Sequence, residues 1–367
     1  MYIKSLKLQN FRNYADESFA FDPAVNLICG ENGQGKTNLL EAAAACSTMR
    51  LFRTAQKKEG LRFGENHAFI FADFLAQERD ISLELRFSRT KAMEIYKNGV
   101  RQKRQSDAQG LLKTVLFCPE DLMLVRAGAA ARRRFLDTAL CQMRPNYARY
   151  LEEYNRLHEH KTRILRDSEE KPSLLSMWED FSLRMAHIGA QIIRYRAYYC
   201  RKLLKAAAAV YADIAPHEVL SGVYKTVSSV TDPFADARTI EKQLIDHVFS
   251  HKTAEIAAKS CLSGPHKDDL ELLLDGRSAA SFGSQGQVRT CTLSLKLAER
   301  ELFFDEDGEY PVLLLDDVLS ELDRRRQDFV LNRISAGQVM ITCCEDGISE
   351  KLRAGAVFHI QNGEKSA

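Results

Sequence analysis

The pattern of apolar and polar positions divides the chain of 367 residues into three zones. In the first, 1–119, apolar runs of strand length alternate with turn signals such as the one at 97–100. The predicted strands include 24–29, 68–75, 81–87 and 114–118. A helix of high propensity is predicted over 38–45. This zone therefore indicates mixed α/β structure.

The middle zone, 120–260, has a different character. Residues 129–188 contain no glycine. Apolar side chains recur there near helical spacing among charged neighbours, at Leu151, Tyr154, Leu157, Ile164 and Leu165. The pattern predicts an all-helical domain, and it leaves open whether its long helices form a short coiled coil or an ordinary bundle.

The α/β pattern returns in the last zone, 261–367. Strands are predicted at 270–274, 312–315 and 339–342, and helices at 288–304 and 324–335. The first and last zones together resemble one α/β domain with the helical zone inserted into it.

Composition narrows the class of protein. The 52 basic and 50 acidic residues leave a net charge of +2, which neither demands nor excludes nucleic acid. The nine cysteines are scattered and include no Cys-x-x-Cys pair, so neither a zinc ribbon nor a disulfide framework is indicated. No apolar run approaches the roughly 20 residues that span a bilayer. We expect a reduced, cytoplasmic protein.

A complete phosphate-binding loop follows the apolar run 25–29 and precedes a helix. Its glycines let successive backbone N–H groups point at phosphate oxygens. Lys36 is predicted to neutralise the β- and γ-phosphates, and the Thr37 hydroxyl to bind Mg²⁺. The predicted nucleotide-binding residues here are Gly30, Glu31, Asn32, Gly33, Gln34, Gly35, Lys36, Thr37 and Asn38.

A pair of acids, Asp316 and Asp317, ends the apolar run 312–315 far along the chain. Ligands bind at the carboxyl ends of parallel strands in α/β sheets, so these acids belong beside the phosphate loop. Asp316 suits a Mg²⁺ ligand, and Asp317 suits the group that orients or deprotonates the attacking water. We predict Lys36 and Asp317 as the catalytic pair.

Two further motifs flank these acids. Ser284, Gln285 and Gly286 stand at a predicted helix start, where backbone N–H groups favour an anion. In isolation this motif fits a helix cap equally well. The segment 320–323, Ser-Glu-Leu-Asp, directly follows the acidic pair.

In this order, the motifs resemble those of the ABC-type ATPases. The opening segment 10–14, Asn-Phe-Arg-Asn-Tyr, and the Gly-x-Asn-Gly-x-Gly-Lys loop resemble the chromosome-maintenance and break-repair branch rather than the transporters. The finer match is to the RecF family of bacterial recombination mediators. It rests on segments 30–41, 119–122, 132–137, 263–270, 283–289 and 313–323.

The resemblance implies an ABC-type ATPase head assembled from the N- and C-terminal segments, with ATP and Mg²⁺ as cofactors. Two heads would sandwich two ATP molecules, with Ser284, Gln285 and Gly286 of one copy touching the γ-phosphate held by Lys36 of the other. Arg12 would also contact phosphate, and Asp323 would link the two sites. The implied partners are double-stranded DNA near gaps, RecR- and RecO-type mediators, and a second copy in an ATP-dependent homodimer. Recombinase loading on single strands would follow.

The chain departs from the ABC pattern in three places. Asp317 stands where a glutamate is usual and is one methylene shorter, which favours a slow ATPase. Cys343-Cys344 replaces the usual switch histidine. Glu120 occupies roughly the place of the glutamine loop.

Basic clusters are the candidates for DNA contact: Arg50, Arg53, Lys57 and Lys58; Arg101, Lys103 and Arg104; and Arg132, Arg133 and Arg134. Interleaved aromatic residues are scarce, so backbone contacts to a duplex suit them better than stacking on single strands. Two other functions were weighed, the energy subunit of a transporter and a small-molecule kinase. The inserted helical zone disfavours the first, and the motifs at 284–287 and 320–323 have no role in the second.

Overall fold

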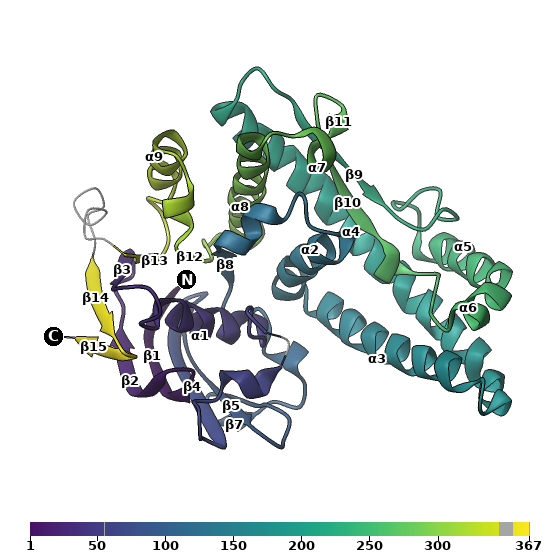
Figure 1. The fold of residues 1–367 in the computed structure, drawn as a ribbon, viewed down its shortest axis with the longest axis horizontal. Helices are drawn as coiled ribbons and strands as arrows, with labels where there is room; N and C mark the ends of the chain where they lie inside the picture. Colours follow the sequence, from purple (N-terminus) through teal and green to yellow (C-terminus); the bar gives the residue numbers. More distant parts are fainter. Residues whose placement is uncertain (55, 345–354, 367) are drawn as a thin grey trace.

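The computed structural model describes residues 1–54, 56–344 and 355–366. An α/β head occupies one end of the molecule and carries both termini, and an elongated lobe rich in helices extends from it (Figure 1). The head is built from both ends of the chain, as the sequence pattern predicted.

The sheet that carries the site combines strands from both ends of the sequence. Its order is β15-β14-β3-β13-β12-β8. The pairs from β14 to β8 are parallel, and β15 is added antiparallel at one edge. The strands are β3 (Val25–Cys29), β8 (Thr114–Phe117), β12 (Val312–Leu315), β13 (Val339–Cys343), β14 (Ala356–Gln361) and β15 (Glu364–Ser366).

Strand β12 shows why this sheet is central. All of its residues are buried, as in a strand covered on both faces. Val312 and Leu314 pack into one hydrophobic cluster, while Leu313 and Leu315 pack into another. The side chains alternate because successive residues of a strand point to opposite faces.

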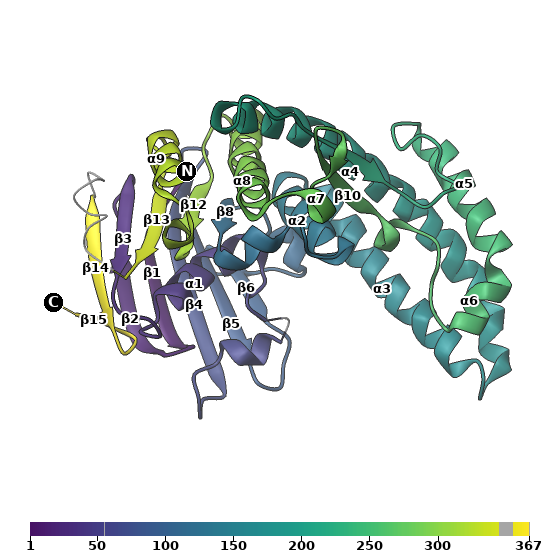
Figure 2. The ribbon, with the colours of Figure 1, turned by 45° about the horizontal axis from the view of Figure 1, so that its top comes forward.

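The first cluster lies between this sheet and an antiparallel one. That second sheet has the order β2-β1-β4-β5-β6-β7, and helix α1 (Lys36–Thr48) is packed between the two sheets (Figure 2). Helix α1 is buried on most sides, which explains its Ala42–Ala45 run. The strands are β1 (Tyr2–Phe11), β2 (Tyr14–Ala20), β4 (His67–Ala76), β5 (Arg79–Ser88), β6 (Glu94–Lys97) and β7 (Val100–Arg101).

The second cluster joins the head to the lobe. Helix α8 (Gln285–Asp307) covers the other face of the parallel sheet and packs along α4 (Trp178–Ile214), the longest helix in the described part of the chain. The remaining helices are α2 (Ala129–Met143), α3 (Pro145–Asp167), α5 (Ala237–Ser250), α6 (Lys252–Ala258), α7 (Ala279–Phe282) and α9 (Arg324–Arg333). Short 3-10 turns include η1 (Lys57–Gly60), η2 (Gln105–Asp107), η3 (Pro119–Met123), η4 (Pro172–Met177), η5 (Pro265–Lys267) and η6 (Val318–Glu321).

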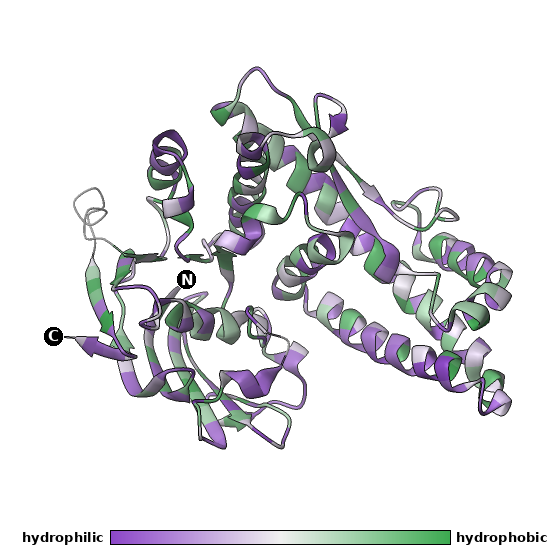
Figure 3. Cartoon of the chain, in the orientation of Figure 1, coloured by the Kyte–Doolittle hydropathy of each residue, from purple (hydrophilic) through white to green (hydrophobic). Residues whose placement is uncertain are grey.

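Helices α3 and α4 form a long hairpin joined through η4. Most of α3 is hydrophilic, and its buried stripe faces the lobe (Figure 3). At the far end the Nζ atom of Lys161 lies 2.6 Å from a carboxylate oxygen of Glu255, and Trp178 donates to the same carboxylate at 3.1 Å. These contacts fasten the tip of the hairpin to α6.

One part of the expected architecture was wrong. The segment 120–260 is not all-helical, because it contains strand β9 (Leu220–Lys225). This strand pairs with β10 (Asp269–Leu274), which also pairs with β11 (Arg277–Ser278). The pairing crosses residue 260, and the domain boundaries stay a prediction.

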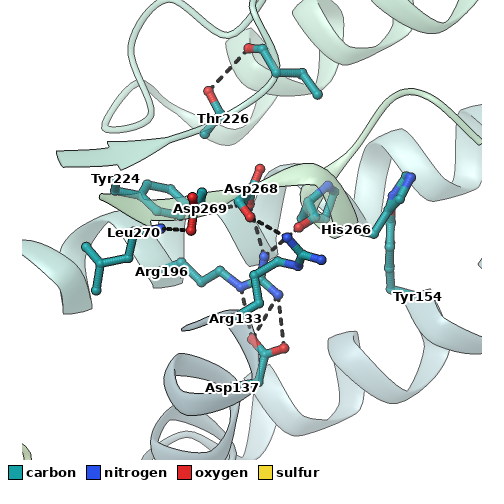
Figure 4. Close-up of polar contacts among 12 residues, drawn as sticks. Arg133, Asp137, Tyr154, Arg196, Tyr224, Thr226, His266, Asp268, Asp269 and Leu270 are labelled. Atoms are coloured by element: carbon teal, nitrogen blue, oxygen red, sulfur yellow. Dashed lines mark hydrogen bonds and ion pairs between the residues drawn. The ribbon is translucent and has the colours of Figure 1, made fainter. Parts of the chain in front are cut away.

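A buried polar cluster ties the lobe together where segments 132–137 and 263–270 meet (Figure 4). Arg196 of α4 donates to both carboxylate oxygens of Asp137, at 2.9 and 3.0 Å, and to Asp268 at 3.0 Å. Arg133 donates to the backbone oxygen of Asp268 at 2.6 Å, and the Tyr224 hydroxyl donates to its carboxylate. One Arg196 guanidinium thus holds together α2, α4 and the segment that enters β10.

The cluster makes the stability of the fold depend on pH. Burial raises the pKa of Asp268 to about 7, although the Arg196 charge opposes the shift. The unfolded chain has the ordinary aspartate pKa of about 3.9. Between pH values of about 4 and 7 the folded state therefore binds more protons than the unfolded chain does. The contribution of Asp268 to stability is lost as the pH rises through this range. Asp268→Asn should flatten the dependence of the unfolding free energy on pH between about 4 and 7.

Denaturant unfolding at several pH values measures this slope, with Asp246→Asn as the control because Asp246 is exposed on α5. Asp268→Asn lowers the absolute stability as well, since it weakens the pairing with Arg196, so the slope is the diagnostic quantity. An unchanged slope would contradict the assignment.

Candidate nucleotide site

The phosphate-binding loop connects β3 to α1. Hydrogen bonds from two turns, β1–β2 and β14–β15, hold its backbone in place. Asn13 donates a hydrogen bond to the backbone oxygen of Gln34 at 2.8 Å, and the Tyr14 hydroxyl donates to that of Gly35 at 3.0 Å. From the β14–β15 turn, the Gly363 N–H donates to the same Gln34 oxygen at 2.9 Å. These bonds fix the outer backbone of the loop, and thus its shape.

Two positions in the loop require glycine. Gly30 has a φ of 147°, and a Cβ there would lie 2.4 Å from the backbone oxygen of Ile360. Gly35 has a φ of 121°, and a Cβ there would lie 2.6 Å from the amide nitrogen of the Asn13 side chain. Any side chain at either position would displace the strand or turn behind the loop.

The Lys36 side chain curls back over its own loop. Its Nζ atom donates to the backbone oxygens of Gly30, at 2.6 Å, and Glu31, at 3.1 Å. Glu31, Asn32 and Gly33 form the exposed crest of the loop. The ammonium group therefore sits within the curve of the loop, where a phosphate chain would be bound.

The two predicted magnesium ligands are in direct contact. The Thr37 hydroxyl donates to the Oδ1 atom of Asp316 at 2.9 Å, although the two residues lie 279 positions apart in the sequence. Thr342 also donates to Oδ1 of Asp316, at 3.0 Å. A hydroxyl and a carboxylate side by side at the mouth of a phosphate loop fit the oxygen ligands that Mg²⁺ prefers.

The electrostatics of Asp316 agree with that role. Burial raises its pKa, and the nearby charges of Asp317 and Glu120 act in the same direction, while the hydrogen bonds from Thr37 and Thr342 oppose them. A bound cation would offset the cost of the buried negative charge. Glu120, from the short turn η3, is thus close enough to influence the metal position.

Asp317 has an unusual backbone conformation. Its φ is 48°, in the left-handed region. Its N–H donates to the Thr342 hydroxyl at 2.7 Å, and its Oδ1 atom lies 3.3 Å from that hydroxyl. Such a conformation costs about 1–3 kcal/mol, and it persists only where the surroundings enforce it. The carboxylates of Asp316 and Asp317 both lie near the Thr342 hydroxyl, and the water-orienting role of Asp317 stays a prediction.

Arg12 lies beside the loop with one nitrogen unused. Its Nε atom lies 2.7 Å from a carboxylate oxygen of the buried Glu41, and Nη1 donates to the backbone oxygen of Glu59 at 2.8 Å. Its Nη2 atom is buried without a hydrogen-bond partner among the described residues. An orphaned cationic donor is costly unless a ligand satisfies it, so the site fits an anionic group here.

Cys344 is a site residue whose role sequence reasoning did not assign. Its thiol is exposed and donates to the side-chain oxygen of Asn32 at 3.0 Å, and the Nζ atom of Lys36 donates to its sulfur at 3.4 Å. Asn38 at the start of α1 donates to the Asn13 side chain at 2.7 Å. The only signal in the sequence was that Cys343-Cys344 replaces a histidine at the end of β13.

The serine motif is not part of this constellation. Ser284 caps α8 through a reciprocal pair with Gln287, whose N–H it accepts at 3.2 Å, and Ser284 and Gln285 are exposed. Ser284 and Gly286 line a cavity of about 650 Å³ together with Asp323 and the end of α4, and none of the residues 30–37, 316 and 317 lines it. In one copy of the chain, the serine motif and the phosphate loop therefore lie apart.

The most concentrated basic cluster is largely paired inside the fold. Arg132 forms a bidentate pair with Asp269 at 2.7 and 2.8 Å, and Arg133 belongs to the buried polar cluster described above. Within this cluster only Arg134 is exposed. Arg132 and Arg133 are paired with groups inside the fold, so Arg134 is the member of this cluster that stays exposed as a candidate for DNA contact.

Comparison with known proteins decides the family. The sequence model of the RecF/RecN/SMC N terminal domain matches residues 2–366. The protein called "DNA replication and repair protein RecF" in Bacillus subtilis is 37% identical over 369 residues, 99% of each chain. That of Acetivibrio thermocellus is 33% identical over 361 residues, 98% of each. The chain belongs to the RecF family.

Solved structures support the same assignment for the fold. A RecF structure described as "the recombination mediator protein RecF-ATP in RecFOR pathway" is 31% identical, with a TM-score of 0.92 over all of this chain and 98% of the other. The Smc head of Pyrococcus furiosus, 15% identical with a TM-score of 0.55, shares the fold alone. This RecF-family chain is thus an ABC-type ATPase head with a helix-rich lobe. No helix in its described residues is long and apolar enough to cross a membrane.

The two predicted catalytic residues should fail in different ways. Lys36→Met removes the cation in the loop and should weaken ATP binding more than tenfold. Asp317→Asn should keep ATP binding but lower hydrolysis by about 10²-fold or more, because the water is no longer oriented. Equilibrium binding of a fluorescent ATP analogue and steady-state phosphate release separate the two. Wild-type hydrolysis by both variants would show that the site has been misassigned.

Proposed function

We propose that the chain is an ATP-switched DNA-binding protein of recombinational repair and replication. ATP closes two copies into a dimer on duplex DNA near a gap, and the dimer cooperates with RecR- and RecO-type mediators to load recombinase on single-stranded DNA. The observation that carries the proposal is the separation of the half-sites. Ser284 and Gly286 line a cavity in one part of the chain, while Lys36, Thr37 and Asp316 form the phosphate site elsewhere.

Each residue of the phosphate site has a task in binding ATP. Lys36 turns from its own backbone oxygens to the β- and γ-phosphates, and the free Nη2 of Arg12 supplies a further donor. Thr37 and Asp316 would hold Mg²⁺, which supplies charge neutralisation at the phosphates when bound. Asp317 orients the attacking water. The Ser284 hydroxyl and the N-terminus of α8 complete the site of a second copy.

A slow rate follows from Asp317. Its side chain is one methylene shorter than the usual glutamate, and its Oδ1 atom lies 3.3 Å from the Thr342 hydroxyl. Reaching a water beside the γ-phosphate requires it to give up that contact. Slow hydrolysis suits a switch that releases the dimer after the DNA has been engaged.

The DNA-binding part rests on exposed cations on the head. Arg50, Arg53 and Lys58 are exposed in the segment that follows α1, and Arg101, Lys103 and Arg104 are exposed at the end of the edge strand β7 and just after it. Scattered cations without aromatic partners contact the phosphate backbone and do not read the bases. The related structure whose description places RecF in the RecFOR pathway supports the biological role.

Dimerisation tests the composite site. The chain should be mainly monomeric without nucleotide and dimeric with ATP, and Ser284→Arg should lose the dimer while keeping ATP binding. Ser284→Asn is the matched control, since asparagine preserves the helix cap without the added bulk. Sedimentation velocity with and without ATP measures the dimerisation of the wild-type chain and of both variants. A dimer that forms equally well without ATP and tolerates Ser284→Arg would refute the composite site.

DNA binding should be stimulated by ATP, prefer duplex over single strand and be largely independent of sequence. Each phosphate contact releases a counterion, so the logarithm of the affinity should fall by roughly 0.9 per log unit of salt for each phosphate neutralised. Replacing Arg101, Lys103 and Arg104 by glutamine should reduce this slope, with dimerisation as the folding control. A flat salt response, or preference for one sequence, would contradict backbone recognition.

A further inference from the structure

One arginine, Arg326, contacts both the serine motif at the start of α8 and Asp323 at the start of α9. Arg326 lies in the first turn of α9, directly after the segment 320–323, and its guanidinium reaches across to the start of α8. Nη2 donates to the backbone oxygen of Gly286 at 3.1 Å, and Nε donates to the Thr290 hydroxyl at 2.9 Å. Nη1 is paired with the carboxylate of Asp323. Helices α8 and α9 lie on the same side of the head (Figure 2).

The hydrogen bonds form a closed and consistent set. The single hydroxyl proton of Thr290 is donated to the backbone oxygen of Gly286 at 2.9 Å, so a lone pair is left to accept from Arg326. Asp323 accepts the backbone N–H of Arg326 at 3.0 Å as the cap of α9. Each of the three guanidinium nitrogens of Arg326 thus has an acceptor in the set.

Glycine at position 286 makes this approach possible. A Cβ there would lie 3.3 Å from Nη2 of Arg326, tighter than ordinary van der Waals contact. A side chain at position 286 would therefore push the guanidinium away by a few tenths of an ångström.

The exposure of the side chains shows which way the set faces. The side chain of Asp323 is 51% exposed and that of Arg326 is 22% exposed. Ser284 is exposed on the same wall, because Ser284, Gly286, Asp323 and Arg326 all line the cavity of about 650 Å³. The groups available to a second copy are Ser284 and Asp323, and Arg326 supports both from behind.

We propose that Arg326 is a positioning residue that holds the serine motif and Asp323 as one rigid surface for the nucleotide of a second copy. It touches no nucleotide itself and acts through Gly286 and Asp323. The inference rests on the proposed function, since it requires the motif to act on the other copy. A planar guanidinium suits the task, because its donors have a fixed fork geometry that a lysine lacks.

Arg326→Gln should leave ATP binding to the monomer unchanged and lower kcat by about 10²-fold, the cost expected when a catalytic group is misplaced by about 1 Å. Arg326→Lys keeps the charge but should recover only a small part of kcat. Arg324→Gln is the matched control, since Arg324 is exposed on the same turn of α9 and the substitution removes the same charge. A normal kcat in Arg326→Gln would overturn the proposal.

Mixing two inactive variants shows on which copy Arg326 acts. In a dimer of Arg326→Gln with Asp317→Asn, one site combines the intact phosphate loop and Asp317 of the first with the intact serine motif of the second. A one-to-one mixture should therefore reach about one quarter of the wild-type rate, because half of the dimers are mixed and each has one working site. Absence of recovery, with both variants still binding ATP and dimerising, would overturn the proposal.

The failure of this inference can be told from failure of the proposed function. If wild-type protein does not dimerise with ATP, the proposed function fails and the inference falls with it. If wild-type protein dimerises and Arg326→Gln has the activity of Arg324→Gln, only the inference fails. Circular dichroism and the thermal midpoint of Arg326→Gln check that it is folded, and Arg326→Lys provides the second variant if it is not.

Discussion

The hydrogen bond from Thr37 to Asp316 is the contact on which the site depends. Its partners are 279 positions apart, and they meet only because β3 and β12 flank β13 in one parallel sheet. The side chains of β12 that alternate between the two hydrophobic clusters fix that sheet between α1 and α8. Packing of the hydrophobic cores on both faces of the sheet thus brings the phosphate loop and the acidic pair into contact.

The same architecture keeps the serine motif away from the phosphate loop of its own copy. Helix α8 covers the face of the sheet opposite α1, and its capped N-terminus opens into a different cavity. Each copy carries a loop that can bind phosphate and a serine motif that can recognise phosphate. In one copy, however, the two lie apart. In the proposed composite site, hydrolysis would be a property of two copies, and the nucleotide would be part of their interface.

Much of this could be predicted from local pattern. Strand β12 was predicted at its observed bounds because four consecutive apolar residues followed by two acids leave little choice. Strand β9 was missed, because its six residues are exposed or half-buried except Leu220, and its pairing with β10 is a long-range event. The pairing of Arg132 and Arg133 could not be predicted, because a run of basic residues does not show which acceptors lie next to it in the folded chain. Asp269, which pairs with Arg132, is 137 positions away in the sequence. Arg326 stands among neighbouring arginines in the sequence, and its contacts with Gly286, Thr290 and Asp323 distinguish it in the structure.

The most direct test of the account is the dependence of ATP hydrolysis on protein concentration. If each working site is shared between two copies, the rate per molecule should rise with concentration while monomers dominate and level off once dimers do. The wild-type chain should show this rise at saturating ATP, with the half-point near the dimer dissociation constant from sedimentation. A rate per molecule that is constant from the monomeric to the dimeric range would show that one copy hydrolyses ATP alone, and would contradict the composite site.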